Sequence, residues 1–182
     1  MTTHRYDGHV HLVGNGLSGS GCWLRLDGLW HRALGEVMRR TIGLEAKATA
    51  RDFDESFVGH LAGLVAASSM DKALLLAQDE VYEDDGRKMD FGSFYVPNAY
   101  LFKVCDRHPE FVPAVSIHPG RKDALEELER CLAGGARALK LLPNCQNVNC
   151  ALPQYDEFWR RMAASGLPFL CHTGGEMTVP VI

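Results

Sequence analysis

Histidine residues near the two ends of the chain have the types and spacing of metal ligands. His9 and His11 flank Val10 in a short segment at the start of the sequence, and His172 follows an apolar segment about 160 residues later. Side chains alternate between the two faces of a strand, so His9 and His11 point to the same side. Imidazole is the commonest metal ligand, and a catalytic zinc ion typically has three protein ligands. The sequence therefore predicts a metal site made of His9, His11 and His172.

The chemistry of such a site follows from the ion. A Zn²⁺ ion held by three imidazoles keeps one position open for water and lowers the pKa of that water to about 7. The site would then supply hydroxide at neutral pH. We expect a divalent metal, with Zn²⁺ as the first choice. Mn²⁺, Co²⁺ and Fe²⁺ are alternatives, because a histidine site accepts all of them and availability often decides.

Five short apolar segments alternate with amphipathic ones along the chain. The apolar segments are apolar on both faces, which is typical of parallel strands covered by helices. The intervening segments repeat apolar residues at helical spacing. Strand followed by helix, repeated, predicts an α/β fold with a parallel sheet, either open or closed into a barrel. The expected strands are 5–13, 72–78, 111–117, 136–142 and 168–172, and the expected helices are 29–40, 54–69, 96–107, 122–133 and 154–164.

Polar side chains gather at the carboxyl ends of the expected strands. His11 ends the first strand, His118 follows the third, Lys140 lies in the fourth and His172 ends the fifth. In a TIM barrel the active site is built at that end of the strands. The first strand is not followed by a glycine fingerprint for dinucleotides, so the Rossmann fold is disfavoured. The pattern therefore favours a (β/α)8 TIM-barrel-like fold.

Composition limits the classes of partner. The chain has 182 residues, of which 46% are hydrophobic and 23% charged, and its net charge is -4. No Lys/Arg stripe follows a phosphate backbone, so we expect no nucleic acid and instead a small-molecule substrate. No apolar run approaches about 20 residues and no signal core precedes the first strand, so we expect no membrane partner and a cytoplasmic location. The six cysteines lack paired spacing and are expected to be reduced.

Four segments in chain order resemble the metal-dependent amidohydrolase superfamily, and most closely its amidohydrolase-related branch. That branch includes small-molecule hydrolases, lactonases and non-oxidative decarboxylases on a distorted (β/α)8 barrel, and the resemblance covers essentially the whole chain. The segments are Asp7-x-His9-x-His11, Ser116-Ile117-His118-Pro119, Ala138-Leu139-Lys140-Leu141-Leu142-Pro143 and Leu170-Cys171-His172-Thr173-Gly174.

The resemblance implies roles for single residues. His9, His11 and His172 would ligate the metal. Lys140 would bind substrate, in our interpretation through a carboxylate, with a lysine that merely caps the barrel mouth as the alternative. His118 would line the substrate pocket, with a rim histidine that has no metal role as the alternative. The catalytic base of the family is an aspartate after the eighth strand, so the catalytic residues of this chain stay unknown.

The length departs from the family pattern. Barrels of this kind need about 250 residues, whereas five β/α units are readable here. We expect residues 1–182 to form the N-terminal portion of a metal-dependent hydrolase barrel that is apparently truncated after the fifth strand, with an insertion at about 12–50. A homo-oligomer or a completing chain would then cover the open sheet edges.

Three functions follow from these observations. The expected one is a metal-dependent hydrolase, in which metal-activated water attacks a small-molecule amide, ester or lactone. The first alternative is a lyase, a non-oxidative decarboxylase of a small aromatic or muconate-like carboxylic acid. The second is an inactive truncated chain that binds metal or a partner. Structural histidines on an open, doubly wound sheet are a further interpretation, which the absence of bound metal would support.

Overall fold

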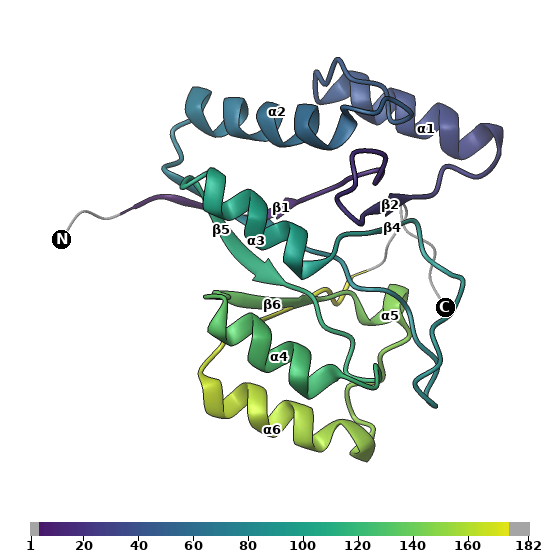
Figure 1. Cartoon of the computed structure of the whole chain (residues 1–182), viewed down its shortest axis with the longest axis vertical. Coiled ribbons are helices and arrows are strands. Elements are labelled where there is room, and N and C mark those ends of the chain that lie inside the picture. Colours follow the sequence, from purple (N-terminus) through teal and green to yellow (C-terminus); the bar gives the residue numbers. More distant parts are fainter. Residues whose placement is uncertain (1–3, 175–182) are drawn as a thin grey trace.

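A parallel sheet of five strands organises the chain. The computed structural model describes residues 4–174, and its strand order is β1-β3-β5-β6-β7, with every neighbouring pair parallel (Figure 1). All five strands expected from the sequence are present, which confirms the α/β fold class. Their bounds are β1 Tyr6–His11, β3 Lys72–Leu76, β5 Phe111–Val115, β6 Ala138–Leu141 and β7 Phe169–Cys171.

Helices connect successive strands and confirm the helical segments expected from apolar spacing. Within residues 4–174, no helix combines the length and the apolar character needed to cross a membrane. The helices are α1 Gly28–Thr41, α2 Phe53–Ala67, α3 Asn98–Arg107, α4 Ala124–Ala133, α5 Pro143–Gln146 and α6 Asp156–Ser165, with a 3-10 turn η1 at Pro153–Tyr155.

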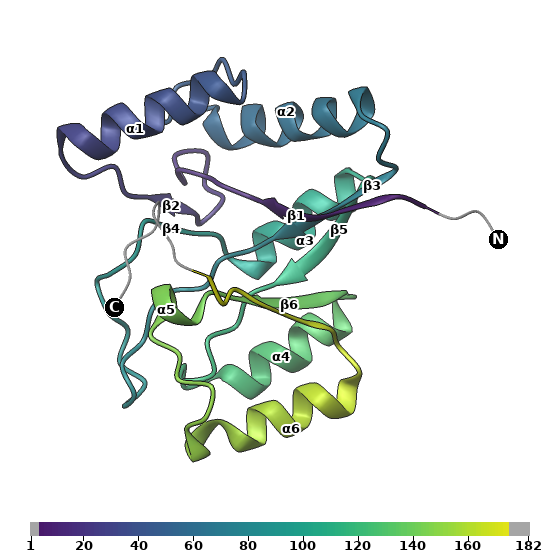
Figure 2. The ribbon, with the colours of Figure 1, turned by 180° about the vertical axis from the view of Figure 1, so that it is seen from behind.

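The two faces of the sheet pack differently. Leu75, Val115 and Leu139 belong to the large core cluster, which the helices share. On the opposite face, Leu76 and Ala114 belong to a small cluster that also contains Ala138, with Leu74 and Leu170 packed against it. Helices α3 and α4 lie in front of the sheet in Figure 1, and the strands lie in front of them in the reverse view of Figure 2. We call the face without helices the inner face, because it corresponds to the interior of a barrel.

A small antiparallel ribbon lies near the carboxyl ends of the strands. It pairs β2, Trp23–Leu24, with β4, Phe94–Tyr95. The sequence did not predict either strand, because two residues show no period. The Phe94 ring meets the His11 ring edge to face, at 6.1 Å between centroids. The ribbon thus borders the position where the metal site was predicted.

The loop after β1 is held by one buried carboxylate. Asp54, in the first turn of α2, is fully buried. Its oxygens accept hydrogen bonds from the backbone N–H groups of Asn15 and Gly16 at 2.6 and 3.3 Å. They also accept from the hydroxyls of Ser18 and Ser20 at 2.9 and 2.5 Å. Four donors satisfy this carboxylate, so it anchors the loop that joins β1 to β2.

Gly16 is expected to be the least replaceable glycine of this loop. Its φ is +77°, and an added Cβ would lie 2.0 Å from the carbonyl oxygen of Cys22. Gly19 has a similar φ of +86° but open space around it. Gly16→Ala should therefore destabilise the fold by about 3 kcal/mol or more, and Gly19→Ala by only about 1 kcal/mol. Urea unfolding of both variants measures the difference, and equal losses would contradict the packing argument.

Candidate functional site

The histidine pair of β1 forms as the sequence predicted. His9 Nε2 and His11 Nε2 lie 3.1 Å apart, and the ring centroids are separated by 5.0 Å. Val10 points away into the large core cluster, so the two imidazoles share the inner face. Two nitrogens bound to one tetrahedral zinc ion at normal bond lengths lie about 3.3 Å apart. The spacing of the pair therefore fits two ligands of a single ion.

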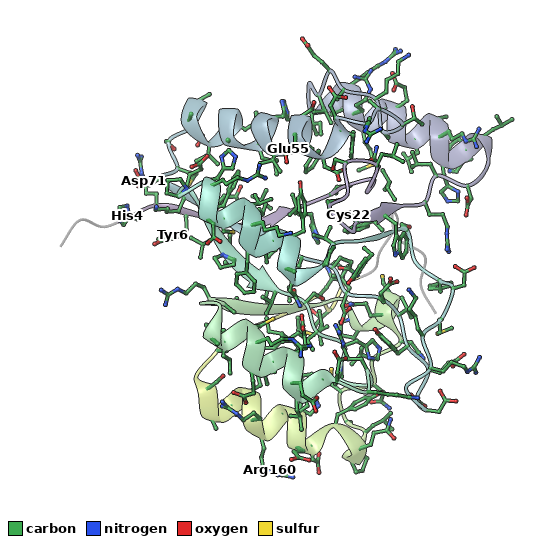
Figure 3. The ribbon with its side chains drawn as sticks, viewed as in Figure 1. His4, Tyr6, Cys22, Glu55, Asp71 and Arg160 are labelled. Atoms are coloured by element: carbon green, nitrogen blue, oxygen red, sulfur yellow. The ribbon has the colours of Figure 1, made fainter. Side chains whose placement is uncertain are left out.

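Asp7 acts on the backbone beside this pair. Its Oδ1 accepts a hydrogen bond from the backbone N–H of His9 at 3.0 Å. The pairing of β1 with β3 shifts register between Asp7 and Val10. The carboxylate therefore holds the irregular stretch of strand that presents His9. Figure 3 shows His4, Tyr6 and Asp71 at the amino end of the sheet, far from Cys22 near the other end.

Charged side chains on β6 and directly after β7 affect the pKa of His9. The pKa of His9 is lowered, first by partial burial, then by the positive charges of Lys140 and His172, while Asp7 opposes the change. Lys140 lies on β6 and His172 directly follows β7. Both side chains therefore lie within electrostatic reach of the pair. A lowered pKa favours the neutral imidazole, which is the form that binds a metal.

His172 is placed near the pair without closing a ligand cluster. Its backbone N–H donates to the Leu141 carbonyl at 3.0 Å, which continues the pairing of β7 with β6. Among residues 4–174, no three His, Cys, Asp or Glu side chains converge closely enough to hold an ion. The structure therefore brings two of the three predicted ligands into contact, and ligation by all three histidines stays a prediction.

Lys140 is almost completely buried, at 1% exposure. It follows Ala138 by two residues and so shares the inner face. Lysine is rarely buried to this extent unless its charge is compensated. A cation at this position suits an anionic group near the histidine pair, and the predicted contact with a substrate carboxylate stays a prediction.

His118 is buried, and both of its ring nitrogens are occupied by backbone groups. Nε2 donates to the Gln146 carbonyl at 2.6 Å, and Nδ1 accepts from the Gly120 N–H at 2.9 Å. Burial lowers the pKa of His118 to about 4, so the ring is neutral with its proton on Nε2. A substrate could reach a ring nitrogen only by displacing one of these bonds. Contact of His118 with a substrate therefore stays a prediction.

Sequence reasoning missed the buried ion pair beside His118. Asp79 accepts the backbone N–H of His118 at 2.7 Å and a hydrogen bond from Arg121 Nη1 at 3.1 Å. Burial raises the pKa of Asp79 to about 6, although the charge of Arg121 opposes the change. The sequence signal that could have revealed this pair is the position of its members: Asp79 directly follows the expected strand 72–78, and Arg121 comes soon after the expected strand 111–117. The pair ties the carboxyl end of β3 to that of β5.

The pKa shifts of Asp79 and His118 predict that the free energy of unfolding changes with pH in opposite directions. The lowered pKa of His118 gives stability that is present above pH 6.5 and lost as pH falls through about 4. The raised pKa of Asp79 gives stability that is present below pH 3.8 and lost as pH rises through about 6. Each effect is roughly 3 kcal/mol. Between pH 4 and pH 6 the loss of stability from Asp79 should therefore nearly cancel the gain from His118 as pH rises.

The variant His118→Gln removes the first of these effects and keeps a hydrogen-bond donor. Relative to wild type, its free energy of unfolding should rise by roughly 3 kcal/mol as pH falls from 6.5 to 4. Urea unfolding across that pH range measures the slope. Parallel pH profiles for the two proteins would contradict the assignment.

Comparison with known proteins agrees with this architecture. No curated protein matches the chain. An uncharacterised TIM-barrel protein from Bordetella bronchiseptica is 16% identical, with a TM-score of 0.58 over 94% of this chain and 56% of its own. The 4-oxalomesaconate hydratase LigJ from Rhodopseudomonas palustris is 15% identical, with a TM-score of 0.54 over 93% of this chain and 52% of its own.

These similarities place the five-stranded sheet within a barrel fold. The chain spans about half the length of the two solved structures that it matches, which agrees with a half-barrel of five strands. Residues 6–182 match the family described as Amidohydrolase. The match includes all five strands and the predicted ligands on β1 and after β7. The chain therefore belongs to the amidohydrolase family.

Proposed function

We propose that residues 1–182 are the N-terminal portion of a metal-dependent hydrolase that acts on a small-molecule amide, ester or lactone. The observation that carries the proposal is the separation of 3.1 Å between His9 Nε2 and His11 Nε2 on the inner face. Family membership supports it, since residues 6–182 match the amidohydrolases. The proposal takes His9 and His11 as two metal ligands and His172 as the third.

The donor set suits a borderline divalent cation such as Zn²⁺, because it consists of imidazole nitrogens. When bound, such an ion would activate water and polarise the bond under attack. The residues of this chain then have separate tasks. Asp7 fixes the backbone of the ligand strand, and Lys140 provides a cation for an anionic group of the substrate.

The exposed edges of the sheet motivate a proposal about partners. Strands β1 and β7 are the outermost strands of the five-stranded sheet, and Phe169 on β7 is 38% exposed. Unpaired strand edges readily accept further strands. We propose that further barrel strands cover them, from a longer chain or from a partner. The 16% and 15% identical structures support this, because this chain spans only half of each.

The test is hydrolysis under control of metal. Hydrolysis of a p-nitrophenyl ester, a lactone and an anilide should fall to background after treatment with dipicolinate and return with one equivalent of Zn²⁺. Activity that survives complete chelation would contradict the proposal. Bound zinc without turnover of any substrate would instead favour the inactive metal-binding chain. Release of CO₂ from an aromatic carboxylic acid would favour the decarboxylase.

A further inference from the structure

One amide side chain near the histidine pair is buried without a hydrogen bond. Gln78 follows β3 by two residues and is 3% exposed. Within the part of the chain that the structure describes, its Oε1 has no hydrogen-bond partner. A buried acceptor that loses its hydrogen bond to water destabilises the folded state. Native proteins contain few such groups, so this one calls for an explanation.

Alternation along β3 directs Gln78 to the inner face. Leu76 belongs to the small cluster of that face, and Ala77 belongs to the large cluster on the helical side. Gln78, the next residue, returns to the inner face. Leu76 is also the residue that pairs with His11 on β1. Gln78 therefore lies one pleat beyond His11 toward the carboxyl ends of the strands, on the neighbouring strand.

The strand register places two further polar residues at the level of Gln78. Leu76 pairs with Ala114, so Gln78 is level with Ser116; Val115 pairs with Leu139, so Ser116 is level with Lys140. Ser116 and Lys140 are each 1% exposed. This polar layer lies directly above the apolar layer formed by Leu76, Ala114 and Ala138. Neighbouring strands are about 4.8 Å apart, so Gln78 and Lys140 are separated by ~10 Å across the sheet.

Among residues 4–174, three further buried polar groups without a hydrogen bond belong to the helical layer. They are the hydroxyls of Tyr100 and Tyr155 and the indole N–H of Trp159. Tyr100 lies on α3, the Tyr155 hydroxyl approaches Gly120, and Trp159 packs against Phe169. None of them shares the inner face with the histidine pair. Of Gln78 and these three residues, Gln78 is the one whose side chain lies beside the candidate site.

The backbone of Gln78 is fixed. Its carbonyl accepts a hydrogen bond from the Val96 N–H at 2.9 Å, and the two residues form an antiparallel bridge. The carbonyl of the next residue, Asp79, accepts from Gln146 Nε2 at 3.3 Å. These contacts hold the chain on both sides of the amide. The direction of the side chain therefore follows from the strand and the ribbon that hold its backbone.

We propose that Gln78 is a specificity residue that accepts a hydrogen bond from a hydroxyl group of the substrate. This inference rests on the proposed function and narrows its substrate to a small amide, ester or lactone that also carries a hydroxyl group and a carboxylate. A carboxamide oxygen can only accept, so its partner must be an O–H or N–H group. Lys140 supplies positive charge in the same layer, which suits a carboxylate on the same molecule.

The test compares two probes that differ by one hydroxyl group, lactate and propionate. The chain contains three glutamines, Gln78, Gln146 and Gln154, so ¹⁵N-glutamine labelling gives three pairs of side-chain amide signals. In zinc-supplemented protein, lactate should bind about fivefold or more tightly than propionate, and should shift the Gln78 amide signal. In Gln78→Leu the preference for lactate should fall to about one.

Gln154→Leu is the matched control. Gln154 is exposed and donates to the Asp84 carbonyl at 3.0 Å, so its loss should leave the preference for lactate unchanged. Gln78→Met keeps the length of the side chain and replaces Gln78→Leu if that variant fails to fold. Equal affinity for the two probes in wild type would overturn the inference, as would a preference that survives in the Gln78 variants or no binding of either probe.

Metal content measured on the same samples separates this inference from the proposed function. Bound zinc without a preference for lactate would overturn the role of Gln78 and leave the metal site intact. A preference for lactate that depends on Gln78 in protein that binds no zinc would overturn the metal-dependent function and support the hydroxyl site.

Discussion

Replacing both His9 and His11 with alanine should abolish metal binding by this chain. The two Nε2 atoms lie 3.1 Å apart on one strand face, close to the separation of two ligands of one zinc ion. Loss of even an outer-shell partner costs 10–100-fold in metal affinity. Each single variant should therefore lose more than about 100-fold, and the double variant should retain no measurable ion.

Equilibrium dialysis against Zn²⁺ followed by plasma mass spectrometry measures the effect. His31→Ala is the matched control, because His31 is exposed on α1 and its ring contacts the Asp27 carbonyl. It should keep the wild-type zinc content. Unchanged zinc content in the double His9, His11 variant would sink the ligand assignment. Zinc lost in His172→Ala would add the third ligand, and zinc retained there would remove His172 from the set.

Asp54→Ala should be among the most destabilising single substitutions in the chain. It leaves two backbone N–H groups and two hydroxyls without their common acceptor. Asn15, Gly16 and Ser20 are partly buried, whereas Ser18 is exposed and can bond to water instead. A buried donor left unsatisfied costs about 1–3 kcal/mol. We expect a loss of about 4 kcal/mol or more in the free energy of unfolding, because Asp54 is fully buried and its partners lie in one loop.

Chemical denaturation measures this loss, with Glu55→Ala as the matched control. Glu55 is the next residue of α2 and pairs at the surface with Arg107 at 3.1 Å. Exposed ion pairs contribute at most about 1 kcal/mol, so Glu55→Ala should be nearly neutral. Asp54→Asn keeps one acceptor oxygen and should lie between the two. A loss for Asp54→Ala within about 1 kcal/mol of the control would refute the anchoring role.

Some site geometry was predictable because it depends on one element. The shared direction of His9 and His11 follows from the period of two in a strand. The register irregularity between Asp7 and Val10 includes His9, yet the two Nε2 atoms still lie 3.1 Å apart. The placement of Lys140 and His172 near the same end followed from the parallel sheet. Their electrostatic effect on His9 agrees with that placement.

Other features were not predictable, because they join residues far apart in the sequence. Asp79 meets His118 across 39 positions, and Asp54 meets Ser18 across 36. A periodic pattern of neighbouring residues carries no information about such distant partners. The role of His118 was equally ambiguous in the sequence. Only its contacts with the backbone of Gln146 and Gly120 in the structure reveal that both ring nitrogens are occupied.

The sequence by itself determined the alternation of strands and helices, the parallel sheet and the direction of the histidine pair. These properties follow from side-chain periods of 2.0 and 3.6, which act over neighbouring residues. Tertiary structure alone decided which polar groups are satisfied. It paired Asp79 with Arg121 and gave Asp54 four donors, and within the described residues 4–174 it left Gln78 Oε1 without a hydrogen-bond partner. Hydrogen bonding of a buried group depends on which distant segments fold around it, and that information appears only when the whole sheet is assembled.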